Sequence, residues 1–220
     1  LPISEFMHAY NYHEKGMLEE AKLEYRKILL KHPDHFDTLR HLGIVYQSLH
    51  DLDKAASFFK AAQKINPLSC EIYNNLGSIL FGAYKLMEAK ELFEKSLSIQ
   101  PNYIPALNNI SLLYYRLRYE QRALVASEKA IKLQPNNLRA KTNRALALSI
   151  NNKLDEAVRI FEEVILEDPN GANYKNLSTA LRDAGETGKS FEVISKAYEA
   201  SPNDEAIFFS HSAFDPCPPI

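Results

Sequence analysis

The 220-residue sequence has few of the residues on which several classes of protein depend. It has no tryptophan, two cysteines and seven scattered glycines. Cys70 and Cys217 are too few for a disulfide framework and lack metal-ligand spacing. A glycine-rich phosphate loop is absent, and no apolar run approaches the ~18 residues of a membrane span. We therefore expect no cofactor, no metal, no membrane span and no enzyme activity.

The charge balance and the first residues also limit the function. The formal net charge is -2 and the pI is near 6.4, whereas nucleic-acid binding generally requires a basic surface. The segment Leu-Pro-Ile-Ser-Glu-Phe has neither the basic region nor the apolar region of a signal peptide, which favours a cytoplasmic location. Because the first residue is not Met, a mature form and an excised piece both remain open.

Proline, by contrast, recurs at a fixed interval. Five prolines stand 34 residues apart and a sixth follows after 33: Pro33, Pro67, Pro101, Pro135, Pro169 and Pro202. A period of this length predicts an array of stacked supersecondary units and not one globule. The units are residues 2–35, 36–69, 70–103, 104–137, 138–170 and 171–204, and they are followed by 205–220.

Each period contains two sets of apolar positions with helical spacing. Positions 4, 7, 8 and 11 lie on one helical face, and positions 20, 24 and 27 lie on another. Gly16, Gly185 and Asn151-Asn152 mark the turn between the helices. The Asn or Asp that often follows the proline is expected to supply turn and N-cap chemistry for the next helix. Positions 8 and 20 are small throughout, which predicts close helix contact: Ala9, Gly43, Gly77, Ser111, Ala145 and Ser178, with Ala21, Ala55, Ala89, Ala123, Ala157 and Ser190.

Together, the small residues, the aromatics at positions 11 and 24 and the proline at position 32 resemble the tetratricopeptide repeat (TPR) family. The resemblance implies an all-α, right-handed superhelical solenoid of antiparallel helix pairs. It departs from the family pattern at Glu5, His8, Ser127, Lys141 and Arg144, and the last two bring tight packing of the fifth unit into question. Residues 205–220 are expected to form a capping helix or a partial seventh repeat with a proline-rich tail.

The resemblance also implies that the first helix of each pair lines a concave groove. Position 6 on that helix reads Met7, His41, Asn75, Asn109, Asn143 and Asn176. An Asn amide offers one acceptor and two donors, so a row of four can pair with a peptide backbone. This row resembles the asparagine ladder in the TPR region of O-GlcNAc transferase. Asparagines that are simply solvated are the alternative interpretation.

Other groove positions carry more basic than acidic side chains, which favours an acidic or polar peptide as the partner. The basic and amide residues expected at the groove are Arg40, Asn74, Asn108, Arg116, Arg139, Lys175 and Arg182. Positions 5 and 9 lack the Lys and Asn pairs of the TPR co-chaperones that hold a chaperone carboxylate. His32, His35 and His41, with Asp34 and Asp37, cluster at one turn, where solvated loop residues are favoured over a metal site.

The sequence thus predicts a non-enzymatic scaffold or adaptor that binds an extended segment of a protein partner in the groove. Two alternatives stay open. One is a substrate-recruiting region of a larger enzyme, such as a glycosyltransferase. The other is a structural protein that self-associates through its tail or its convex face.

Overall fold

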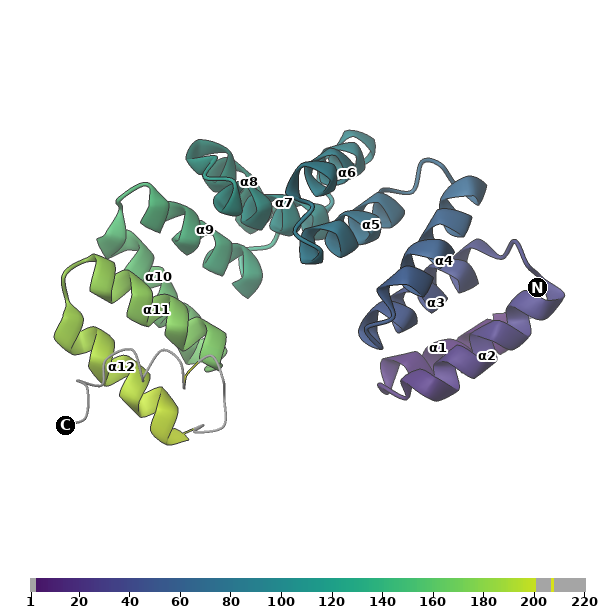
Figure 1. Ribbon diagram of the computed structural model, residues 1–220, viewed down its shortest axis with the longest axis horizontal. Helices are drawn as coiled ribbons and strands as arrows, with labels where there is room; N and C mark the ends of the chain where they lie inside the picture. The colour runs from purple at the N-terminus through teal and green to yellow at the C-terminus, as the bar shows by residue number, and fades with distance from the viewer. Residues whose placement is uncertain (1–2, 201–206, 208–220) are drawn as a thin grey trace, which may run out of the picture. The chain divides into compact units, whose positions relative to one another are not determined.

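A computed structural model describes residues 3–200 and 207, and the chain forms twelve α-helices and no strand within these residues (Figure 1). The chain divides into two compact units, Leu1–Asn109 and Ile110–Ile220, and the division falls inside α7 (Ile104–Arg116). None of the described helices has the length and apolar character needed to cross a membrane. The predicted all-α fold is confirmed.

The first unit consists of three helix pairs and the start of α7. Each helix packs against the next along the chain, and the helices are α1 (Ile3–Glu14), α2 (Leu18–Lys31), α3 (Phe36–Ser48), α4 (Leu52–Ile65), α5 (Cys70–Gly82) and α6 (Leu86–Ile99). A core of fully buried side chains runs through the first two pairs and into α5; it includes Tyr25, Leu42, Phe59 and Ile72.

The second unit repeats this arrangement. After the end of α7 it contains α8 (Glu120–Leu133), α9 (Leu138–Ile150), α10 (Leu154–Glu167), α11 (Gly171–Asp183) and α12 (Thr187–Ala200). Ile207 is buried against Ile194 and Ala197 of α12. The other residues of the expected capping segment 205–220 lie outside the described part of the chain.

The turn inside each helix pair places one residue in the left-handed region. Gly16 and Gly185 have φ of 72° and 83°, and Asn152 has φ of 58°, as the turn signals predicted. The equivalent residues His50, Tyr84 and Arg118 have φ near 60° without being glycine (φ 61°, 59° and 60°). A side chain at such a position costs about 1 kcal/mol or more relative to glycine, so three turns carry local strain.

The residue after the proline lies in the turn between repeats, as expected, but it caps the next helix in only some of them. Asn170 follows its proline directly and accepts a hydrogen bond from the Asn173 amide, as predicted. In three other repeats the cap is one residue later, at His35, Ser69 and Asn137. The residue directly after the proline occupies the turn there, because the helix begins three residues after the proline.

The small residues at positions 8 and 20 meet inside the pairs, as expected. Ser111 Oγ donates to the carbonyl of Ala123 (2.9 Å), and Ser190 Oγ donates to the carbonyl of Ser178 (2.7 Å). A Cβ built on Gly43 would lie 2.6 Å from the ring of Phe59. The glycine therefore makes room for the aromatic ring at position 24.

The two cations at apolar positions of the fifth repeat do not disturb its packing. Lys141 Nζ lies 3.0 Å from Glu167, and Arg144 pairs with Glu156 and lies 3.8 Å from Glu128. The ion pairs hold the cationic ends at the surface, while the flanking Ala140, Ala145 and Leu148 remain buried. α9 and α10 accordingly pack against each other like the other pairs.

Candidate peptide-binding surface

The first helices of successive pairs contact one another. α1 touches α3, α3 touches α5, and α9 touches α11, whereas α2 and α4 have no such contact among the described residues. The first helices therefore lie closer together than the second helices within a unit. In each unit, we call the surface that these helices share the first-helix face. The predicted asparagine row divides between the units, with Asn75 and Asn109 on first helices of the first unit and Asn143 and Asn176 on first helices of the second.

Two asparagines of this face belong to a network between repeats. Asn109 on α7 donates through its amide nitrogen to Asn74 Oδ1 (2.8 Å) and to Ser78 Oγ (3.1 Å), both on α5. Asn74 is 5% exposed, and Ser78 in turn donates to the carbonyl of Asn74 (3.0 Å). Both donors of the Asn109 amide are therefore used inside the chain.

The four asparagines of the row differ in their surroundings. Asn143 is 3% exposed and has intramolecular partners, as Asn109 does. Asn75 and Asn176 are half-buried, and neither has a hydrogen-bond partner among the described residues. The row thus contains two engaged amides and two whose donors and acceptor are available.

Arg40 is the most enclosed cation predicted for this face. Its guanidinium lies 3.6 Å from Asp37 and 3.7 Å from Glu71, and it contacts His41 Nε2 at 2.9 Å. Glu71 belongs to the next repeat, so Arg40 joins α3 to α5. Its charge is largely balanced within the chain.

His41 occupies position 6 of the second repeat and is enclosed by aromatic and imidazole rings of the first repeat. The sequence did not predict these contacts. The ring centroids of Phe6, Tyr10, His13 and Tyr25 all lie within 6 Å of the His41 centroid (5.4, 5.3, 5.7 and 5.9 Å). Position 24 marked Tyr25 as a core residue, but nothing in the period marked His13 as its neighbour.

The ring cluster lowers the basicity of its histidines. Burial lowers the pKa of His41 to about 4, and the nearby Arg40 and His13 act in the same direction. Burial also lowers the pKa of His13. Both imidazoles are therefore neutral at physiological pH, and His41 contributes a ring and not a charge to the first-helix face.

The remaining basic residues predicted for the groove are exposed. Arg116 lies on α7, Arg139 on α9, and Lys175 and Arg182 on α11. Among the described residues, no ion pair forms at Arg116, Lys175 or Arg182. Asn108, the last residue of the predicted set, is 5% exposed on α7.

Two residue types with catalytic or metal-binding potential have structural roles. The His35 ring caps α3 by accepting the Thr38 amide (3.3 Å) and contacts Thr38 Oγ1 (2.6 Å). The Cys70 thiol donates to Gln100 Oε1 (3.1 Å), and burial raises its pKa. A thiol with a raised pKa is a poor nucleophile at neutral pH.

Three family models of the tetratricopeptide repeat match residues 6–69, 70–100 and 120–181. No curated protein matches the sequence closely enough to count as a relative. Many solved structures share the fold, among them the following three.

All three are low in sequence identity and high in coverage. A tetratricopeptide repeat protein from Parabacteroides merdae has a TM-score of 0.77 at 20% identity, over 96% of this chain and 84% of that chain. PilW, a type IV pilus biogenesis factor, has a TM-score of 0.81 at 21% identity, over 93% and 96%. YrrB, a TPR protein with an unusual peptide-binding site, has a TM-score of 0.62 at 20% identity, over 86% and 97%. At this identity the likeness shows a common fold.

Proposed function

Because this chain belongs to the tetratricopeptide repeat family, whose fold supports protein–protein interaction scaffolds, we propose that the first-helix face of each unit binds an extended segment of a partner protein. One available asparagine amide in each unit carries the proposal, Asn75 in the first unit and Asn176 in the second. Each amide can accept from a backbone N–H and donate to a backbone C=O of a peptide in extended conformation. The peptide-binding site of the structural neighbour YrrB is consistent with this role.

The surroundings of Asn75 favour a rigid binding surface. Asn75 lies on α5 beside the network of Asn74, Ser78 and Asn109, which holds α5 against the start of α7. A helix that is held by its neighbours loses less conformational freedom when it binds, so more of each hydrogen bond appears as affinity.

The charges suggest which segment each unit prefers. In the first unit, Asp37 and Glu71 balance Arg40. In the second unit, Lys175 adjoins Asn176 on α11, and its ammonium group is exposed without an ion pair among the described residues. We therefore assign the preference for acidic or polar residues to the second unit, where the peptide carboxylates meet exposed cations.

Selection from a phage-displayed library of random linear peptides tests the proposal. A selected peptide is synthesised, and its affinity is measured by fluorescence anisotropy for the wild type, Asn75→Ala and Asn176→Ala. One hydrogen bond contributes roughly 0.5–1.5 kcal/mol net, so a variant that loses one of its two bonds should bind about two- to tenfold more weakly, and a variant that loses both should bind more weakly still. The melting temperature should stay unchanged, because neither amide has an intramolecular bond to lose.

Two further variants serve as controls. Asn102→Ala removes an exposed turn asparagine and should leave the affinity unchanged. Asn109→Ala removes the bonds to Asn74 and Ser78 and should lower the stability of the chain. If every selected peptide binds the Asn75→Ala/Asn176→Ala double variant as tightly as the wild type, the first-helix face does not hold the peptide as proposed.

A further inference from the structure

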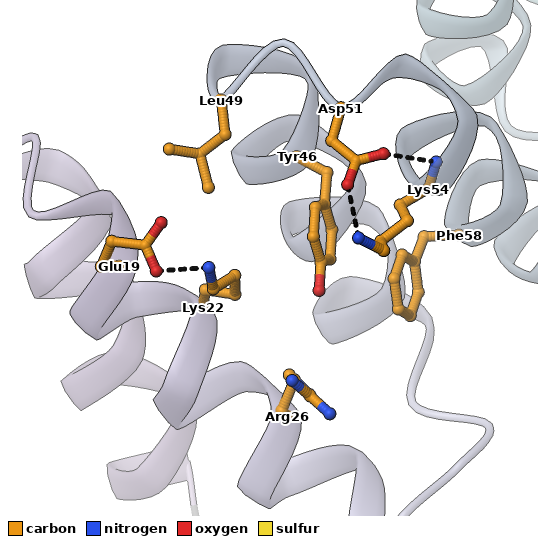
Figure 2. A pocket seen from close by; sticks show the side chains of 8 residues that line it. All are labelled: Glu19, Lys22, Arg26, Tyr46, Leu49, Asp51, Lys54 and Phe58. Carbon is orange, nitrogen blue, oxygen red and sulfur yellow. Dashed lines mark hydrogen bonds and ion pairs between the residues drawn. The ribbon is translucent and has the colours of Figure 1, made fainter.

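The first unit has a pocket on the side of the second helices, away from the residues discussed above. Its volume is about 660 Å³, and Figure 2 shows the side chains that line it. They come from α2, from α3 and the turn after it, and from α4: Glu19, Lys22, Arg26, Tyr46, Leu49, Asp51, Lys54 and Phe58. The pocket lies where α2 and α4, which do not contact each other among the described helices, leave space between two repeats.

Two stacked aromatic rings form part of the pocket wall. Tyr46 and Phe58 lie parallel, with ring centroids 5.3 Å apart and an interplanar angle of 6°. Leu49 adds an aliphatic side chain on the turn, and the Lys54 ammonium lies 5.4 Å from the Tyr46 centroid. Phe58 and Leu49 are only partly buried, so an apolar side chain of a ligand can bury further area against them.

The charges of the lining leave one cation unbalanced. Lys22 pairs with Glu19, and Lys54 pairs with Asp51 at 2.6 Å, as the dashed lines in Figure 2 show. Arg26 is exposed on α2 and has no ion pair among the described residues. In Figure 2 the Tyr46 ring extends from α3 toward Arg26. A planar guanidinium next to aromatic rings matches a carboxylate that adjoins an apolar side chain.

The repeat register indicates that helix packing does not require this cation. The positions equivalent to Arg26 in the next four repeats are Lys60, Glu94, Glu128 and Glu162. Position 23, which holds Phe58, reads Glu24, Leu92, Ala126 and Ile160 in the first and third to fifth repeats. The combination of a cation with stacked aromatic rings therefore belongs to the junction of the first two repeats.

We propose that this pocket, the α2–α4 pocket, binds an acidic peptide segment of a partner protein. An aromatic or large aliphatic side chain packs on the partly buried Phe58 and Leu49, and an adjacent Asp or Glu carboxylate accepts hydrogen bonds from Arg26. The site is separate from the first-helix face, so one partner can contact both faces of the first unit or two partners can bind at once.

Differential selection tests the site on the whole chain. A phage-displayed library of random linear peptides is selected on the wild type and counter-screened on Arg26→Ala, Lys60→Ala and Asn75→Ala. Arg26 is exposed, so its replacement leaves the fold intact. Lys60→Ala is the matched control, because it removes an exposed cation at the same register one repeat later and outside the pocket.

We expect a class of peptides that lose affinity on Arg26→Ala but bind Lys60→Ala and Asn75→Ala normally. Members should share an Asp or Glu next to an aromatic or large aliphatic residue. The loss on Arg26→Ala should be about three- to tenfold and should shrink at high salt, as for a partly exposed charge pair. Replacing the acidic residue of a selected peptide by its amide should give a similar loss.

Several results would overturn the proposal. One is the absence of any peptide that distinguishes the wild type from Arg26→Ala. Another is an equal loss on Lys60→Ala, which would indicate general charge attraction. Displacement of a bound peptide by inorganic phosphate but not by acetate would instead define a phosphate site. Loss on Asn75→Ala alone would leave the first-helix face as the binding surface and remove the α2–α4 pocket.

Discussion

Substitution of Gly77 by alanine tests the packing that places the helices of the third pair. Gly77 lies on α5, and a Cβ at this position would stand 2.7 Å and 2.8 Å from Phe93 Cε1 and Cδ1. Phe93 is fully buried on α6, so its ring has little room to move. The new methyl group must therefore separate α5 and α6 or turn the ring out of its preferred rotamer.

Two opposing effects determine how much Gly77→Ala changes the free energy of unfolding. Alanine is favoured over glycine in a helix by about 1 kcal/mol. Overpacking a filled core costs about 1–3 kcal/mol. Ala145 and Phe161 occupy the equivalent positions of the fifth pair and are both buried, so this register can hold a methyl group in another pair. We expect Gly77→Ala to be neutral to destabilising, by up to about 2 kcal/mol in the free energy of unfolding.

Gly82→Ala on the same helix provides the control. Gly82 is exposed, and an added Cβ would meet nothing within 4 Å. This variant gains only helix propensity, by up to about 1 kcal/mol. The two alanine variants should therefore differ by about 1–3 kcal/mol, the packing cost alone.

Urea unfolding followed by circular dichroism measures these differences, and m-values show whether the cooperativity is kept. The double variant Gly77→Ala/Phe93→Leu should lose at least about 0.5 kcal/mol less free energy of unfolding than the sum of the two single variants, because contacting residues couple. If Gly77→Ala stabilises the chain as much as Gly82→Ala does, the Phe93 ring does not require glycine at this position.

Two other perturbations follow from local geometry. Tyr84 is 79% exposed and has a φ of 59°, which is strained for any residue other than glycine. Tyr84→Gly should therefore raise the free energy of unfolding by about 0.5–1 kcal/mol in urea titration. Tyr84→Ala keeps a side chain at this φ and should not raise it. The pKa of His41 is about 4 in the folded chain against 6.5 ordinarily, so the unfolded chain binds a proton first as pH falls. The free energy of unfolding should therefore fall progressively from pH 6.5 down to about 4, by roughly 1–2 kcal/mol after allowance for the partial exposure of His41. The variant His41→Asn should show a flatter dependence of stability on pH in this range. Equal slopes for the variant and the wild type would contradict the lowered pKa of His41.

The helix pairs, their turns and the small residues between them could be predicted because the period presents each signal several times. A single Ala or Gly says little, but Gly43 and Gly77 at the same register as Ala9 and Ala145 indicate a recurrent close contact. The start of each helix was less predictable. The cap at His35 depends on an imidazole in place of the usual Ser, Thr, Asn or Asp, and the proline alone does not locate it.

Contacts between repeats were harder to predict, because they join different positions of the period. The ring cluster around His41 combines positions 5, 9, 12 and 24 of the first repeat with position 6 of the second. The α2–α4 pocket likewise requires that two second helices stay apart, and no single motif indicates that separation. A single sequence shows the register of these residues but not which of them face each other.

The different states of Asn109 and Asn75 at position 6 follow from the repeat before each of them. Asn109 is engaged because that repeat presents two polar side chains, Asn74 and Ser78, at positions 5 and 9. Asn75 meets a different pair at those positions: Arg40, already held by carboxylates, and the apolar Ile44. One sequence position therefore serves inter-repeat packing in one case and leaves an amide available in the other. Whether the amide at position 6 is available thus depends on pairs of adjacent repeats, and it changes with the residues at positions 5 and 9 even where the asparagine itself is unchanged.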